Sequence, residues 1–270
     1  MNSIFTNISS IQAQQALSRT DRTMQDAMVK LSTGLRVNKA ADDAAGLAIG
    51  NRLHSQILGL NQAVRNAYDG MSMLQTADGA TANLADVLAR MKELSIQSAS
   101  DTNGTSDRNA LNVEFKELQA GIKTIIDNTS WNGVKVLNGS LTEVNFQVGA
   151  VNGDRITVNF GNLTELRALA SDGIDTPDGA VNAMTDMDDS IDALNRVRTL
   201  WGAAANRLAH AADNASTVAM NISASKSRIL DTDYAQATAD LARAQILQAA
   251  GTAMLSQANQ QPLTVLRLLR

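Results

Sequence analysis

Apolar residues recur every three or four positions through three long stretches of the chain. The first stretch, residues 44–99, contains no proline, and a continuous helix of that length would extend about 84 Å. A rod of this kind needs antiparallel companions, and the polar segment 102–107 (TNGTSD) supplies a reversal into the second stretch. The sequence therefore predicts three long helices. Their apolar positions are Leu84, Leu88, Met91 and Leu94; Leu111, Phe115, Leu118, Ile122 and Ile125; and Ile191, Leu194, Trp201, Leu208, Ala215, Val218 and Ile222.

Both ends of the chain also carry apolar residues at helical spacing, but their remaining positions are mostly Ala, Gln, Asn and Ser. One interpretation is a pair of amphipathic helices packed on the body of the protein. The interpretation we favour is a surface for copies of the same chain, because neutral faces are buried without desolvating ions. The positions concerned are Ile4, Ile8, Ile11, Leu17, Met24, Met28 and Leu31 at one end, and Leu247, Ala250, Met254, Ala258, Val265, Leu266, Leu268 and Leu269 at the other.

Between the helices the apolar period changes from 3.6 to 2. Two alternating runs flank Asn152-Gly153, a turn signal, so a β-hairpin is expected over about 143–161. The acidic stretch 172–189 is interpreted as a solvated loop leading into the third helix. The predicted fold class is mainly α, with long antiparallel helices in coiled-coil or bundle layers and one small β-hairpin region.

The composition supports helices and excludes several classes of function. With 3% aromatic residues, 2 prolines and no cysteine, the chain has neither a disulfide framework nor a cysteine-based zinc site. A net charge of -4 argues against a nucleic-acid partner. The uncharged run 244–266 raises the question of a membrane span, but its Gln, Asn and Ser residues and Pro262 make insertion costly, so none is predicted.

No candidate for catalysis or metal binding survives inspection. The carboxylates from Asp186 to Asp192 fail the calcium-loop pattern and are interpreted as a charged helix N-terminus. Asp42-Asp43 is interpreted as a helix cap, and His54 as a surface residue. Since hydrolase, P-loop and dinucleotide fingerprints are also missing, we expect neither an enzyme nor a cofactor.

Several segments resemble bacterial flagellins. Residues 31–49, LSTGLRVNKAADDAAGLAI, are similar to the N-terminal segment of that family, and 131–140 (WNGVKVLNGS) and 146–150 (FQVGA) to its central part. The C-terminal segment 243–260, RAQILQAAGTAMLSQANQ, followed by the final VLRLLR, is the most diagnostic. Together with further matches, the resemblance covers roughly residues 1–160 and 185–270, in the expected order.

The resemblance implies a structural subunit that is secreted unfolded through an export channel and assembles into the extracellular flagellar filament. It implies a terminal coiled-coil domain of residues 1–40 with 230–270. It also implies a helical rod of residues 41–229, with the hairpin at about 141–161 and a short outer loop at about 162–185. The large outer domains of long flagellins are expected to be absent. Filament assembly is assigned to Ile4, Ile8, Ile11, Leu247, Met254, Val265, Leu266 and Leu269.

Further partners enter by resemblance: a flagellar export chaperone, the filament cap and hook-associated proteins. Residues 89–99 are similar to the segment read by a vertebrate Toll-like receptor, with Arg90, Leu94, Gln97 and Glu114 at matching positions and Lys92 where arginine is common. Residues 29–50 are similar to a peptide sensed by a plant receptor kinase. Asp43 is retained in that peptide, whereas Leu35 and Lys39 depart from its usual small residues. Helix packing would also explain these residues.

Two alternatives rank below the filament subunit. A hook–filament junction protein has flagellin-like ends, but such proteins diverge from the LSTG, DDAAG and Leu-Leu-Arg patterns kept here. A coiled-coil scaffold would carry charges beside its seam along its whole length, which the uncharged run 244–266 lacks.

Overall fold

The structure is a computed structural model that describes residues 6–161, 163 and 173–268, with 261–268 described as backbone. Its contacts divide the chain into two compact units, Met1–Ser55 with Asn221–Arg270, and Gln56–Met220. The first unit holds α1 (Ile8–Thr33) and α5 (Tyr234–Leu268). The second holds α3 (Thr105–Asn128), the strands and most of α2 (Ala44–Ala99) and α4 (Pro177–Leu230).

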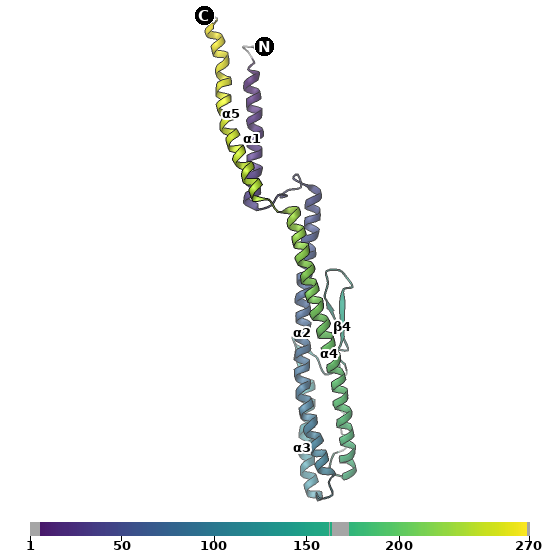
Figure 1. The fold of residues 1–270 in the computed structure, drawn as a ribbon. Coiled ribbons are helices and arrows are strands. Elements are labelled where there is room, and N and C mark those ends of the chain that lie inside the picture. The colour runs from purple at the N-terminus through teal and green to yellow at the C-terminus, as the bar shows by residue number, and fades with distance from the viewer. Residues whose placement is uncertain (1–5, 162, 164–172, 269–270) are drawn as a thin grey trace. The chain divides into compact units, whose positions relative to one another are not determined.

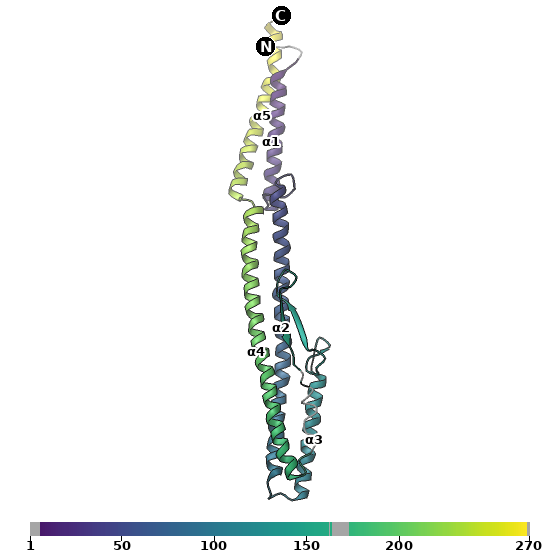
Figure 2. The same ribbon diagram turned by 90° about the vertical axis from the view of Figure 1, so that its right-hand side faces the viewer.

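The three predicted long helices are confirmed. The proline-free stretch forms the single helix α2, and the segment TNGTSD reverses the chain into α3. In the unit Gln56–Met220, α2 lies beside both α3 and α4 in two perpendicular views (Figure 1 and Figure 2). Two ion pairs, Arg198 to Asp78 at 2.7 Å and Lys92 to Asp188, show that α4 runs antiparallel to α2, because the residue numbers rise on one helix as they fall on the other. The ion pair from Arg90 to Glu114 at 2.9 Å and the hydrogen bond that Arg108 donates to the Ser98 carbonyl at 2.9 Å show the same for α3.

The loop predicted over residues 172–189 is wrong from Pro177 onward, where α4 already begins. Proline suits the first helical position because the amide hydrogen it lacks would have no intrahelical acceptor there. The Thr176 hydroxyl oxygen accepts the Gly179 amide at 3.1 Å and caps the first turn. Ala180, Ala183 and Met187 are buried, so this stretch belongs to the core although its composition is acidic.

The predicted hairpin consists of β3 (Glu143–Gln147) and β4 (Arg155–Asn159), paired antiparallel with Val144 opposite Val158 and Phe146 opposite Ile156. Ile156 and Val158 are buried and their neighbours exposed, as the period of 2 predicts. A second pair, β1 (Ser130–Trp131) with β2 (Val134–Lys135), was not predicted. Its turn is Asn132-Gly133 with both φ angles positive, the conformation that Asn-Gly favours in tight hairpins.

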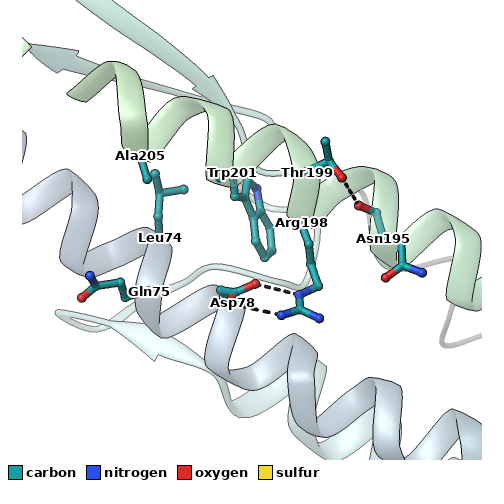
Figure 3. Close-up of a pocket in the computed structure, with 9 residues that line it drawn as sticks. Leu74, Gln75, Asp78, Asn195, Arg198, Thr199, Trp201 and Ala205 are labelled. Carbon is teal, nitrogen blue, oxygen red and sulfur yellow. Dashed lines mark hydrogen bonds and ion pairs between the residues drawn. The ribbon is translucent and has the colours of Figure 1, made fainter. Parts of the chain in front are cut away.

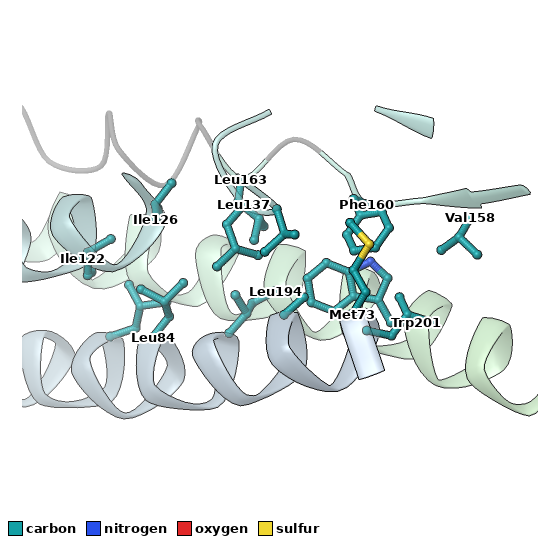
Figure 4. Packing of buried hydrophobic residues seen from close by; sticks show 14 of the residues in the cluster. Met73, Leu84, Ile122, Ile126, Leu137, Val158, Phe160, Leu163, Leu194 and Trp201 are labelled. Atoms are coloured by element: carbon teal, nitrogen blue, oxygen red, sulfur yellow. The ribbon is translucent and has the colours of Figure 1, made fainter. Parts of the chain in front are cut away.

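The core of the unit Gln56–Met220 runs between α2, α3, α4 and the strands (Figure 4). Leu84, Leu194 and Ile122 bring one apolar residue from each helix, and all three are buried. Trp201 closes this core against Phe160, with ring centroids 5.8 Å apart, and its indole N–H donates to the Asn159 carbonyl at 3.2 Å. Leu137 and Leu163 cover the same core. The helices thus pack through mainly aliphatic contacts.

None of the described helices contains a stretch long and apolar enough to cross a membrane.

Candidate assembly surface

Helices α1 and α5 pair along a seam with heptad spacing (Figure 1). On α1, buried or half-buried residues follow alternate steps of three and four, and α5 shows the same pattern. This spacing is that of an antiparallel coiled coil. The seam residues are Ser10, Ala13, Leu17, Thr20, Met24, Ala27 and Leu31 on α1, and Ala237, Leu241, Ala244, Gln248, Gly251, Leu255 and Ala258 on α5.

Small and polar side chains dominate this seam. The Asn7 amide donates to the Ala258 carbonyl at 2.8 Å, and the Gln248 amide donates to Asp21 at 2.9 Å. A Cβ added to Gly251 would meet Leu17 at 3.4 Å. Because few large apolar groups are buried between α1 and α5, the pairing contributes little hydrophobic stabilisation by itself.

The described residues assigned to filament assembly lie off this seam. Ile8 is 54% exposed, Ile11 47%, Leu247 51% and Met254 65%. Ile4 and Leu269 lie outside the described residues, as do the side chains of Val265 and Leu266. The expected stripe Leu247, Ala250, Met254 and Ala258 does not face α1 as a unit, because only Ala258 reaches the seam. The coiled coil therefore leaves the large apolar side chains of Ile8, Ile11, Leu247 and Met254 about half exposed or more.

Two crossing segments close the base of the coiled coil. Gly34 ends α1 in a left-handed conformation with φ 71°, and its amide donates to the Lys30 carbonyl at 2.9 Å. The next residue, Leu35, forms an isolated bridge with Asp231. The Arg36 backbone amide donates to the Leu230 carbonyl at 2.6 Å and its guanidinium to the Ile229 carbonyl at 2.5 Å, so α4 is capped from the other end of the chain.

Asp43 caps α2, which confirms that interpretation for this residue, whereas Asp42 closes the turn before the helix and does not cap it. The Asp43 carboxylate accepts the Gly46 amide at 2.9 Å at the start of α2. The Asp42 carboxylate accepts the amides of Lys39 and Asn38 at 2.9 and 3.0 Å. These two hydrogen bonds, the Lys39 one foremost, hold the pKa of Asp42 below its usual value.

A shallow groove of about 540 Å³ lies between α2 and α4 in the unit Gln56–Met220 (Figure 3). Leu74, Trp201 and Ala205 give it an apolar wall, and the Arg198–Asp78 ion pair lies at its edge. The hydrogen bond that Arg198 donates to Asp78 raises the pKa of Arg198 above its usual value, against the effect of burial. Because Asp78 is held in this pair, the groove offers no free carboxylate for acid–base chemistry.

Comparison with known proteins decides the family. The model of the bacterial flagellin N-terminal helical region matches residues 4–142, and that of the C-terminal helical region matches residues 184–269. The chain belongs to the bacterial flagellin family. A flagellin of Halalkalibacterium halodurans is 43% identical over 91% of this chain and 92% of its own length. The flagellar filament 33 kDa core protein of Treponema phagedenis is 37% identical over 98% of both chains.

A crystal structure of Bacillus cereus flagellin aligns with a TM-score of 0.52 and 29% identity, covering 56% of this chain and 88% of that one. This flagellin is therefore a non-enzymatic subunit of the extracellular flagellar filament, which serves motility and forms by self-polymerisation.

Among the residues matched to receptor recognition, the structure brings Arg90 and Glu114 together on the surface of the flagellin. Arg90 also pairs with Glu93 at 3.0 Å. The hydrogen bonds that Arg90 donates to Glu114, and next those to Glu93, raise the pKa of Arg90. Gln97 is exposed, whereas Leu94 is only 1% exposed and lies in the core. A substitution of Leu94 would therefore act through packing.

The interpretation of Asp186 to Asp192 as a helix N-terminus is wrong. These carboxylates begin about two and a half turns inside α4, and Asp188 pairs with Lys92 of α2. In the described part of the flagellin, no three His, Asp or Glu residues are placed to hold a metal ion. His54 is exposed as expected, 3.4 Å from the Lys226 ammonium.

Proposed function

We propose that the α1–α5 coiled coil is the part of this flagellin that polymerises, through the apolar side chains that it leaves in solvent. The observation that carries the proposal is the half-exposed state of Ile8, Ile11, Leu247 and Met254, off a seam built of small residues. Ile4, Val265, Leu266 and Leu269 extend this assignment to the chain ends. The corresponding assembly domain comprises residues 1–40 and 230–270, and residues 41–229 form the rod.

The energetics favour order in the polymer. Burying the exposed half of a Leu, Ile or Met side chain contributes roughly 1 kcal/mol, so the four described residues supply roughly 4 kcal/mol per subunit. Gln14, Gln15 and Ser256 surround them, and burial of these neutral groups desolvates no ion. The seam between α1 and α5 buries few large apolar side chains, so the isolated coiled coil does not offset the conformational entropy lost on ordering. Burial against neighbouring subunits supplies the missing free energy.

Seeded polymerisation tests the assignment. Purified monomer is mixed with short filament fragments, and elongation is followed by light scattering and electron microscopy. We expect the full chain to elongate and a chain lacking residues 1–35 and 236–270 not to. Met254→Gln should slow elongation, whereas Met220→Gln, which alters a side chain with the same 65% exposure on α4, should slow it less. Equal effects of the two substitutions would remove the assignment.

We propose three filament-related partners from the family resemblance: an export chaperone, the filament cap and hook-associated proteins. The exposed apolar residues of α5, including Ile246 at 69%, support a chaperone that covers this helix before assembly. Hydrogen exchange should then show α5 protected in the complex and α3 unchanged. Protection confined to the unit Gln56–Met220 would contradict the assignment.

We also propose host-receptor recognition at two places. The exposed Arg90–Glu114 pair supports a site for the vertebrate Toll-like receptor, with Gln97 on the same helix. Arg90→Ala should lower receptor signalling in a reporter cell line while the helical circular dichroism is kept, and unchanged signalling would reject the site.

Asp43 supports the plant receptor kinase site. Asp43→Asn keeps a side chain that caps helices well, whereas Asp43→Ala does not. Loss of plant signalling with both variants would assign a direct contact. Loss with Asp43→Ala alone would reduce the residue to a helix cap.

A further inference from the structure

Two arginines of α1 lie in solvent without an ionic partner. Arg19 and Arg22 line a shallow hollow of about 450 Å³ with Ile11, Gln15 and Ser18, on the side of α1 away from the seam. Neither guanidinium has an ion pair or hydrogen bond with any residue that the structure describes. Unpaired cations beside otherwise neutral lining residues point to a carboxylate outside the same chain.

Helix α5 carries the matching carboxylate. Asp240 accepts only the Gln236 amide, at 3.2 Å, from its own helix. The nearby Asp233 carboxylate is already used, because it accepts the amides of Ala235 and Gln236 and caps α5. Asp240 is therefore the helical carboxylate at this end of α5 that remains available for an ion pair.

The spacing along the two helices agrees as well. Asp240, Leu247 and Met254 are seven residues apart and share one line on α5, and Arg22, Gln15 and Ile8 are seven apart on α1. Seven residues correspond to two turns, about 10.5 Å, in both helices. When the lines are set antiparallel, Arg22 meets Asp240 and Ile8 meets Met254 in one register, with the aliphatic stem of Gln15 against Leu247.

A filament requires such a contact between unlike faces. Head-to-tail contacts, in which one face of a subunit meets a different face of the next, generate open helical assemblies. Contact between two α1 faces would instead place arginine against arginine.

We propose that the hollow on α1 receives the Asp240–Leu247–Met254 line of α5 from a second copy, with Arg19 and Arg22 paired to Asp240 of that copy. The inference rests on the proposed assembly role of the coiled coil, and it adds the ion pair that sets the register between neighbours.

Charge reversal in trans tests the pairing. One full-length chain carries Arg19→Glu and Arg22→Glu, and a second carries Asp240→Arg. We expect each alone to elongate filament seeds of its own sequence about tenfold more slowly than wild type, because like charges meet at the contact. A one-to-one mixture on wild-type seeds should regain most of the rate, since in an alternating polymer every contact again joins opposite charges.

Controls distinguish a lost ion pair from a folding defect, and test the ion pair separately from the assembly role of the coiled coil. Circular dichroism should show unchanged helix content in both chains, and Arg19→Lys with Arg22→Lys should elongate like wild type. Either reversed chain mixed with wild type should be incorporated poorly, because its altered face still meets a like charge on the wild-type chain. Elongation of the reversed chains at the wild-type rate, or a mixture as slow as its components, overturns the pairing. If the pairing is overturned but Met254→Gln still slows elongation, the proposal that the coiled coil polymerises stands without the ion pair.

Discussion

Glycine-to-alanine substitution should change the free energy of unfolding differently at two positions of α2. Gly70 lies against the β3–β4 hairpin, whereas Gly79 does not. A Cβ added to Gly70 would lie 2.9 Å from Phe146 Cδ1 and 3.0 Å from Cε1, closer than such atoms pack. The Asn66 amide donates to the Gln147 carbonyl at 3.1 Å and holds the hairpin at this place. Gly79 lies on the same helix, and a Cβ there would have no heavy atom within 4 Å.

The expected free energies follow from two terms. Alanine in place of glycine inside a helix stabilises by about 0.5–1 kcal/mol. Gly79→Ala keeps this gain in full. At Gly70 the extra methyl overpacks the Phe146 ring at a cost of about 1–3 kcal/mol. We therefore expect Gly70→Ala to leave the free energy of unfolding unchanged or lower it by up to about 2 kcal/mol, and to fall below Gly79→Ala by about 1–3 kcal/mol.

Urea unfolding followed by tryptophan fluorescence measures the difference. Trp131 and Trp201 both belong to the unit Gln56–Met220, which also contains both glycines, so the signal reports the unit that is altered. Combining Gly70→Ala with Phe146→Leu should give a smaller loss than the sum of the single changes, because the ring edge is gone. Equal stabilisation by Gly70→Ala and Gly79→Ala would refute the close approach of hairpin and helix.

Three further substitutions or conditions test other contacts. Trp201→Phe should destabilise the same unit by about 1–3 kcal/mol in urea, because the Asn159 carbonyl loses its buried donor. Asp43→Ala should lower the melting temperature of the unit that contains the start of α2, as the lost cap costs about 0.5–2 kcal/mol, while Asp43→Asn should not. The pKa of Asp42 is lowered on folding, so its stabilising contribution is present above pH 3.8 and is lost as pH falls through its folded value. A carboxyl titration by NMR should accordingly give Asp42 a midpoint below 3.8, and a midpoint at or above it would contradict the two amide contacts.

Local periodicity was enough to determine the main elements. The uninterrupted helical spacing of residues 44–99 specifies α2, because backbone hydrogen bonds and side-chain spacing inside a helix depend only on near neighbours. The alternation around Val144 and Ile156 likewise specifies β3 and β4, and Asp43 just before α2 specifies its cap. The N- and C-terminal segments, which match the flagellin family, also identify the chain as a flagellin without reference to its fold.

Tertiary contacts decided which face of each helix is buried, which residues near in sequence cannot determine. The α5 sequence offers several apolar stripes, and only the presence of α1 selects the one through Ala244, Gly251 and Ala258 and leaves Leu247 and Met254 exposed. The seam is detectable in retrospect as a heptad of small residues, but small residues give a weak hydrophobic signal.

The acidic start of α4 is helical because Ala180, Ala183 and Met187 are buried on one face, which outweighs the local preference of Asp, Gly and Thr for turns. The same dependence on neighbours buries Leu94 while Arg90, one turn away, reaches the surface and Glu114 of α3. Sequence thus determined which segments are helices and strands. The tertiary structure decided which of their faces are buried, because burial depends on partners that are distant along the chain.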